Sequence, residues 1–269
     1  MRELIVDSHC HVDYDGLAGR LPEVLSNCRE QGVGLMLSIS SLVKNFPRLL
    51  AIAEAYDNIY CTVGTHPHHA HEELDVSVAE LVRLAQHPKV IGIGEAGLDY
   101  HYDLSPRAAQ MQGFRHHITA ARETGLPLVI HTRTAEEDTA RVLEEEMGRG
   151  AFKAVLHCFT SQAWLAEKGV ALGLYVSFSG ILTYKTADDL RSTAKALPVD
   201  RLLVETDAPF LAPIPFRGKS NEPSYVVKTL EQLALLRGLT RDEMAYLTSA
   251  NFFRLFDKVK VPATFRQNA

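Results

Sequence analysis

The feature that most constrains the fold of this chain is a regular alternation of short, β-branched runs with longer helical patterns. Eight runs have the length and composition of buried strands, and they are Leu4–Ser8, Val33–Ile39, Ile59–Gly64, Val90–Gly94, Leu126–His131, Ala154–His157, Leu174–Phe178 and Arg201–Thr206. Strands that alternate with helices pair in parallel through helical crossovers. Eight such units in 269 residues predict an α/β fold, a single (β/α)₈ TIM barrel, with a doubly wound sheet as the alternative.

The last part of the chain departs from this alternation. A helical pattern that starts near Val226 follows Asn221, a candidate N-cap, and Pro223, which suits a first turn. Residues 241–258 then predict one extra C-terminal helix, and residues 259–269 are expected to be a frayed tail. We therefore expect one barrel domain over residues 1–258, followed by the tail.

Composition narrows the class of protein. The 28 basic and 33 acidic residues give a net charge of −5, which disfavours tight binding of long duplex nucleic acid but leaves room for a local phosphate site. No run approaches the ~18–20 apolar residues of a membrane span, so no membrane association is expected. The four cysteines form no CxxC pair, which favours reduced thiols and a cytoplasmic location.

Ionisable residues gather where the predicted strands end, and barrels place their chemistry at the carboxyl ends of strands. Six strand ends carry such residues, which are His9 and His11, His66, Glu95, His131, His157, and Glu205 with Asp207. Twelve histidines placed by chance would be scattered over loops and helices. This clustering is the strongest functional signal in the sequence.

The pair His9 and His11 illustrates the geometry. Residues i and i+2 of a strand point to the same face, so both imidazoles should enter the barrel mouth while Cys10 points to the helix layer. Two histidines in a loop are the plain alternative. Their position after an apolar strand and an aspartate favours a shared cation.

The full set favours metal binding. Glu95, His131 and His157 each stand alone at a strand end, and each is explained equally well as a hydrogen-bonded residue of the barrel mouth. Several buried ionisable groups without a cation would nevertheless be costly together. A mixed histidine and carboxylate set suits Zn²⁺, Mn²⁺ or a similar divalent cation. The residues outnumber the ligands of one tetrahedral site, which makes two metals plausible, with Glu95 as the bridge.

The remaining polar residues receive supporting roles. Asp207 is expected to hold the attacking water and accept its proton, since a metal lowers the pKa of such a water towards ~7. Glu205 is interpreted as a residue that orients a ligand histidine, or equally as a buried structural acid. We expect His66 to line the pocket and the histidines within residues 68–71 to occupy a solvated loop.

Several segments together resemble the TatD family of metal-dependent deoxyribonucleases, within the amidohydrolase superfamily. The matching segments are Asp7-Ser8-His9-Cys10-His11, Gly64-Thr65-His66-Pro67, Gly94-Glu95-Ala96-Gly97-Leu98-Asp99-Tyr100, Pro127-Leu128-Val129-Ile130-His131, His157-Cys158-Phe159, Glu205-Thr206-Asp207-Ala208-Pro209 and Phe216-Arg217-Gly218-Lys219-Ser220-Asn221-Glu222-Pro223. The resemblance implies a TIM barrel with two divalent metals that hydrolyses phosphodiesters of DNA. By the same resemblance, one metal would be held by His9, His11, Glu95 and Asp207, and the second by Glu95, His131 and His157.

Substrate contacts are expected on the loops of the same face. Phosphate groups need cations beyond the metals, and Arg133, Lys185, Arg217 and Lys219 follow strands 5, 7 and 8, although ordinary solvated charge explains each one equally well. Aromatic side chains after strands 4 and 6 are expected to stack on exposed bases, and they are Tyr100, Tyr102 and Phe159.

Three functions fit these observations. The leading hypothesis is a metal-dependent nuclease that trims single-stranded DNA ends, with DNA as its partner and no obligate protein partner. The second is a metal-dependent hydrolase of another ester or amide, including the aminoacyl ester of tRNA. The third is a non-catalytic metal-binding barrel. The sequence does not choose between Zn, Mg and Mn.

Overall fold

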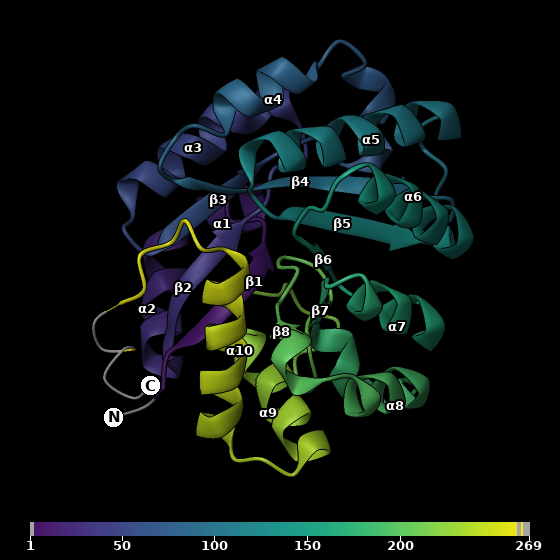
Figure 1. The fold of residues 1–269 in the computed structure, drawn as a ribbon. Coiled ribbons are helices and arrows are strands. Elements are labelled where there is room, and N and C mark those ends of the chain that lie inside the picture. The colour runs from purple at the N-terminus through teal and green to yellow at the C-terminus, as the bar shows by residue number, and fades with distance from the viewer. Residues whose placement is uncertain (1–2, 263–264, 266–269) are drawn as a thin grey trace.

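Eight parallel strands form the barrel that the sequence predicts. The computed structural model describes residues 3–262 and 265 (Figure 1). The strands pair in chain order from first to last, and they are β1 Ile5–Cys10, β2 Val33–Ser38, β3 Ile59–Val63, β4 Val90–Asp99, β5 Leu128–Arg133, β6 Ala154–Leu156, β7 Tyr175–Phe178 and β8 Leu202–Val204. The sheet closes just beyond β8, where the His11 amide donates to the Ala208 carbonyl over 2.8 Å and the Asp207 amide donates to His9 over 2.9 Å.

Helices surround this sheet (Figure 1). They are α1 Asp15–Ala18, α2 Leu21–Gln31, α3 Phe46–Ala55, α4 Val78–Leu84, α5 Arg107–Thr124, α6 Glu136–Arg149, α7 Ala163–Ala171, α8 Asp188–Ala196, α9 Val226–Arg237 and α10 Arg241–Leu255. Short 3₁₀ segments interrupt the loops at η1 Val43–Asn45, η2 Pro67–Glu72, η3 Gly180–Thr183, η4 Val199–Arg201 and η5 Pro223–Tyr225. Within the described residues, no helix is both long and apolar enough to cross a bilayer.

The strand β1 shows how the barrel separates its two faces. Ile5 and Cys10 face outward into the apolar layer under the helices, whereas Val6 faces the lumen. Asp7 pairs with Met36 of β2 and Cys10 with Ser38, so β1 carries one extra residue between these two points. Such a bulge redirects the side chains that follow it. It leaves His9 and His11 in the lumen, with Cys10 between them on the outer face.

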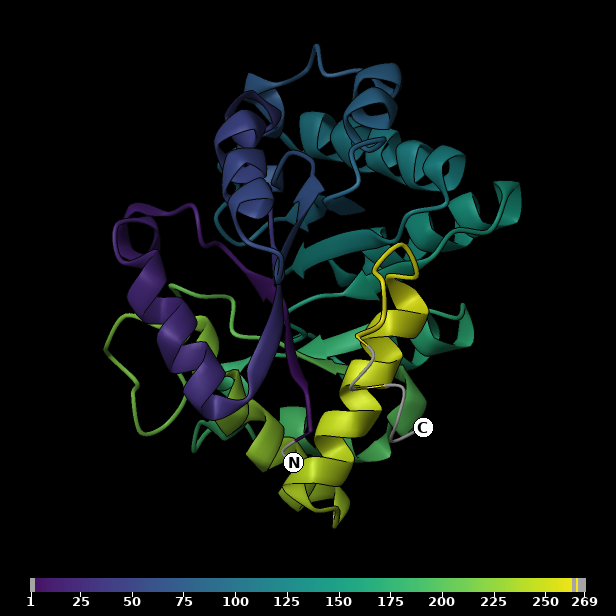
Figure 2. The same ribbon diagram turned by 90° about the vertical axis from the view of Figure 1, so that its left-hand side faces the viewer.

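The extra helix α10 closes the amino-terminal end of the barrel (Figure 2). Thr240 and Glu243 form a reciprocal capping box at its start. Phe252 of this helix and Phe256, which caps its C-terminus, are fully buried among inward-facing residues of the strands, which include Val6, Leu35, Ile91, Val129 and Leu203. The Asn251 amide donates to two carbonyls where β8 begins, over 2.8 and 2.9 Å.

Two expectations for the last part of the chain were wrong. The tail is not frayed at Val259 and Phe265, which are buried on the α10 cluster, with Phe265 stacked 5.3 Å from Tyr246. Residues 1–2, 263–264 and 266–269 lie outside the described residues. Asn221 does not cap α9, because its amide donates instead to the Thr206 and Phe210 carbonyls over 2.9 and 2.6 Å.

Candidate metal centre

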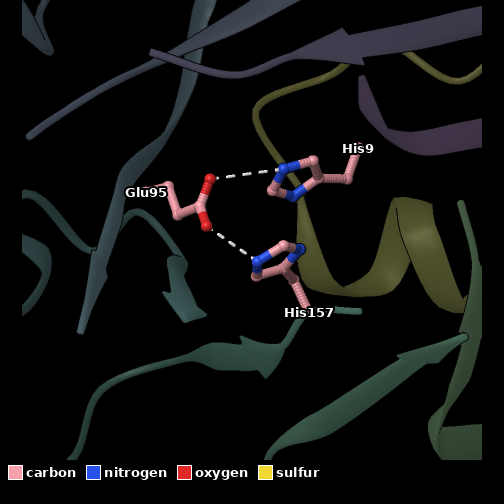
Figure 3. Close-up of side chains that lie close together, drawn as sticks. All are labelled: His9, Glu95 and His157. Carbon is pink, nitrogen blue, oxygen red and sulfur yellow. Dashed lines mark ion pairs between the residues drawn. The ribbon is translucent and has the colours of Figure 1, made fainter. Parts of the chain in front are cut away.

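Glu95 lies at the centre of a buried cluster in the barrel mouth. Its carboxylate projects from β4 between histidines of several other strands (Figure 3). One oxygen, Oε2, lies 3.4 Å from His9 Nε2. The other oxygen, Oε1, lies 2.8 Å from His157, 2.9 Å from His131 and 3.4 Å from His66. One oxygen of this carboxylate therefore faces His9, and the other faces three imidazoles.

A second carboxylate faces the β1 histidines. Asp207 follows β8 with a left-handed φ of 56°, which aspartate tolerates better than most residues. Its Oδ1 lies 3.5 Å from His9 Nε2 and 3.4 Å from His11 Nε2. The Asp207 side chain is 16% exposed, whereas that of Glu95 is 2% exposed. Asp207 thus lies on the open side of the cluster, where water can reach it.

Two of the histidines are oriented by their other ring nitrogen. Nδ1 of His11 lies 3.2 Å from the Ile39 carbonyl, which leaves Nε2 facing Asp207. Nδ1 of His157 lies 3.2 Å from Glu205 Oε1, which leaves Nε2 facing Glu95. Ligand histidines in metal sites are held in this way by a carbonyl or a carboxylate. Glu205 therefore lies on the side of the His157 ring opposite to Glu95.

A third orienting residue, Asp99, was missed by the sequence reasoning. The strand β4 continues five residues beyond its predicted end and finishes at Asp99. Asp99 Oδ2 lies 3.0 Å from His131 Nε2 and 2.9 Å from His68 Nε2. His68 is therefore not in a solvated loop, as expected, but belongs to the shell around the cluster. The i, i+4 spacing of Glu95 and Asp99 on one strand face would have indicated both.

Glycine allows this extension of β4. Gly97 has a φ of +150°, and a Cβ atom there would lie 1.9 Å from the His131 carbonyl oxygen. Any side chain would therefore push β4 away from β5. The close approach sets Glu95 and Asp99, on either side of Gly97, against the two ring nitrogens of His131.

Both carboxylates of the cluster are held ionised. Burial alone would raise the pKa of Glu95, but His157 and His66 outweigh it and lower that pKa well below the usual range. Burial would likewise raise the pKa of Asp207, but the hydrogen bond with His11 and nearby imidazoles lower it. At neutral pH the two groups therefore act only as acceptors or ligands.

The donor set fits a divalent cation. His9 is fully buried, yet neither of its ring nitrogens makes a hydrogen bond within the described chain. Three groups of residues could each hold an ion, and they are His9, Glu95 and His157; His9, His11 and Asp207; and His66, Glu95 and His131. An unpaired buried nitrogen is costly, and a cation between these groups would satisfy it.

Comparison with known proteins identifies the family. Residues 6–257 match the model of the family described as TatD related DNase. The chain belongs to the TatD family. It is 40% identical to the uncharacterized metal-dependent hydrolase YcfH of Escherichia coli, over 94% of this chain and 95% of the relative. It is 36% identical to the 3′-5′ ssDNA/RNA exonuclease TatD of Erwinia tasmaniensis, over 87% and 93% of the two chains.

A solved structure shows the same barrel. The crystal structure of YJJV, a TatD homologue from Escherichia coli, superposes with a TM-score of 0.88 at 31% identity, covering 96% of this chain and 98% of that one. The chain is therefore a metal-dependent hydrolase of the TatD family, as its sequence motifs imply.

Around the cluster, this TatD-family chain exposes the cations expected to meet phosphate, Lys185 among them. Arg133, Arg217 and Lys219 are all exposed at the mouth end of the barrel. The Arg133 guanidinium lies 4.7 Å from the ring centroid of Tyr102, and that of Arg217 lies 4.5 Å from the ring of Tyr184. None of the three forms an ion pair within the described residues, so their charge is available to a ligand.

Only one of the predicted stacking residues is free to stack. Phe159 is buried against Phe178, at 6.3 Å between ring centroids, and was wrongly expected to face a base. Tyr100 is tied to Asp138 by a hydrogen bond of 2.8 Å. Tyr102 alone is exposed to solvent, at 52%.

Proposed function

We propose that this TatD-family hydrolase cleaves phosphodiester bonds of single-stranded DNA from an end, with two divalent cations. The observation that supports this most directly is the position of Glu95, whose Oε2 faces His9 while its Oε1 faces His131 and His157. A carboxylate shared in this way suits a pair of ions. Two ions about 3.5–4 Å apart stabilise the attacking and leaving oxygens of an in-line displacement at phosphorus.

The residues of the chain supply the remaining parts of the reaction. Asp207 would hold the attacking water and accept its proton, because it is ionised and lies at the open side of the cluster. Glu205 would keep Nε2 of His157 pointing inward, and Asp99 would do the same for Nδ1 of His131. Arg133, Arg217 and Lys219 would neutralise phosphates beside the scissile one.

The substrate class is supported by likeness and by charge. The Erwinia tasmaniensis relative carries the name 3′-5′ ssDNA/RNA exonuclease. A net charge of −5 with a few unpaired cations at the mouth fits a short stretch of backbone better than a long duplex. We also propose a cytoplasmic location, since all four cysteines are free thiols.

The test of the function is a metal and substrate panel. The purified protein is stripped with a chelator, and Zn²⁺, Mn²⁺ or Mg²⁺ is added back separately. End-labelled single- and double-stranded DNA of one sequence, RNA, an aminoacyl ester and simple amides are then offered. We expect metal-dependent shortening of the single strand, faster than that of the duplex. Hydrolysis of an ester or amide with no cleavage of any nucleic acid would overturn the proposal.

The test of the shared carboxylate is metal retention. Glu95→Ala should lose more bound metal than His11→Ala, because Glu95 would contact both ions and its loss leaves two cations to repel each other. Metal content is measured after dialysis against a graded chelator series. His87→Ala serves as the control, since His87 pairs with Glu54 outside the cluster, 3.2 Å away. Equal metal retention in the Glu95 and His11 variants would contradict the proposal that Glu95 contacts both ions.

A further inference from the structure

Two half-exposed aromatic side chains flank the metal centre. Phe210 is 51% exposed and lies beside the β1 histidines, 6.4 Å from the His11 ring. Tyr102 is 52% exposed and lies on the other flank, 5.5 Å from the His68 ring. Between these two flanks lie Glu95 and the histidines around it. Exposure of a large apolar ring to water is unfavourable, and the free energy falls when a flat ligand covers the ring.

Both rings are carried on rigid backbone. The Phe210 amide donates to the Asp207 carbonyl over 2.9 Å, and the buried Asn221 side chain donates to the Phe210 carbonyl over 2.6 Å. The Tyr102 amide donates to Asp99 Oδ1 over 2.9 Å. The segment that positions Phe210 thus also carries Asp207, and the segment that positions Tyr102 also carries Asp99. A ligand that stacks there would pay little ordering entropy.

The surroundings of each ring indicate what the ligand is. On the Tyr102 side, the Arg133 guanidinium lies over the ring, 4.7 Å from its centroid, so a half-exposed ring and a cation with no ion pair among the described residues occur together. On the Phe210 side, Tyr14 stands edge-on to the phenyl ring at 5.9 Å and 87°, which leaves a right-angled aromatic corner. Flat rings linked by negative charge are the chemistry of unpaired nucleotides.

We propose that Phe210 and Tyr102 are base-stacking platforms for the nucleotides on the two sides of the scissile phosphodiester. This inference rests on the proposed nuclease function and adds a reason for its strand preference. A base can lie on either ring only when it is unpaired and unstacked. A duplex would have to open at both nucleotides before its phosphate reached Glu95 and Asp207.

The experiment compares substrates with and without bases. The variants are Phe210→Ala, Phe210→Leu and Tyr102→Ala, with Leu104→Ala as the matched control, because Leu104 is a 60% exposed aliphatic residue on the same loop as Tyr102. The substrates are a short single-stranded oligonucleotide, the same strand with a tetrahydrofuran abasic residue on one side of the cleaved bond, and methyl 4-nitrophenyl phosphate. Binding is followed through the fluorescence of 2-aminopurine placed at each of these positions, because stacking quenches it.

For each alanine variant we expect KM for the oligonucleotide to rise about tenfold, the usual effect of losing one base–aromatic stack. Turnover of methyl 4-nitrophenyl phosphate and all properties of Leu104→Ala should stay within about twofold of wild type. The penalty should vanish on the strand that is abasic at the matching position, and 2-aminopurine quenching should be lost there. Phe210→Leu should resemble the alanine variant, because it keeps apolar area without a flat ring.

The outcomes separate the two proposals. Suppose that the wild-type protein cleaves both the oligonucleotide and the small diester, and that the variants keep their KM and quenching. The proposal of base stacking on Phe210 and Tyr102 is then wrong, whereas the proposed nuclease function is retained. An equal penalty on the normal and abasic strands would also overturn the platforms. If the wild-type protein cleaves neither substrate with any of the three metals, the nuclease proposal fails. A leucine variant that behaves as wild type would indicate an apolar contact with another class of ligand, against base stacking.

Discussion

The two ends of the barrel lumen are built from the same strands but in opposite ways. At the amino-terminal end, Phe252 of α10 and the C-cap residue Phe256 fill the space between inward-facing aliphatic side chains. At the carboxyl-terminal end, histidines and carboxylates converge instead. Of the five buried side-chain polar atoms that lack a partner within the described residues, four belong to this end, on His9, Asp13 and Glu205.

One end of the barrel therefore contributes mainly to stability, and the other end contributes mainly to ligand binding and chemistry. Burial of apolar area at the amino-terminal end stabilises the barrel and leaves little there for a ligand to satisfy. Unpaired polar atoms at the other end cost stability, and a cation or substrate can recover that cost. The two ends should therefore respond to substitution in different measurements, which the following variants test from the largest expected effect to the smallest.

The largest effect is expected for Asp207→Asn. The asparagine keeps the size of the side chain and one oxygen that can ligate, but it cannot accept a proton. Turnover should fall by a factor of ~10²–10⁴, the range for loss of a general base. Metal content and substrate affinity should fall much less, as measured by metal analysis and oligonucleotide binding. Near-normal turnover at saturating metal would make Asp207 a ligand alone, and the base would then be Glu205 or the metal-bound hydroxide itself.

At the other end, Phe256→Ala should affect stability and leave the metal centre intact. Removal of a fully buried phenyl group costs about 3–5 kcal/mol through lost burial and a cavity. For a chain of this size the melting temperature should fall by roughly 10 °C. Phe210→Ala is the control, because that ring is half exposed and its loss should barely change melting. Weaker metal binding by folded Phe256→Ala would show that the two ends are coupled.

An intermediate effect is expected for Glu205→Gln. The glutamine can still accept from His157 Nδ1, but it loses the charge that favours this orientation. Metal affinity should fall about 10- to 100-fold, as for other residues that orient a ligand histidine. Thr229→Val is the matched control, since Thr229 on α9 carries the one unpaired buried atom outside the mouth among the described residues. That change should raise stability slightly and leave metal affinity alone; an unchanged affinity for Glu205→Gln would make Glu205 a structural acid.

These predictions rest on parts of the molecule that the sequence specifies to different degrees. The strands were predictable because apolar β-branched runs at regular spacing have few other uses, and the fold that they predict is confirmed. The side chains of His9 and His11 were predictable because strand geometry places i and i+2 together. The bulge in β1 was not predicted, but it precedes this pair and preserves it.

The missed and mistaken residues share a physical cause. The predicted strand stops at Gly94, but Gly97 allows a close backbone contact with β5, so β4 continues to Asp99. Phe159 follows β6 in a loop, and loops are normally exposed, yet it packs against Phe178. Phe210 lies near the site because Asn221 ties its carbonyl, a long-range hydrogen bond that no local pattern reports.

The smallest effect is expected for the cations of the loop after β8. Arg217 and Lys219 are exposed, and Glu222, the next acid along the chain, is already paired with Arg20 and hydrogen-bonded to Asn27. If each cation neutralises one phosphate of a single strand, alanine at either position should weaken oligonucleotide binding a few-fold at low salt. It should also reduce the slope of log K against log salt by about 0.7.

Metal content should remain intact in both variants, because neither side chain belongs to the cluster. Lys195→Ala is the matched control, since Lys195 is an equally exposed cation in the last turn of α8, towards the amino-terminal end. A lysine there contributes to net charge but not to the mouth, so its loss should leave the salt slope unchanged. Equal effects of all three substitutions would mean that oligonucleotide binding depends only on the net charge of the protein. The difference between the two ends of the barrel would then not extend to substrate binding.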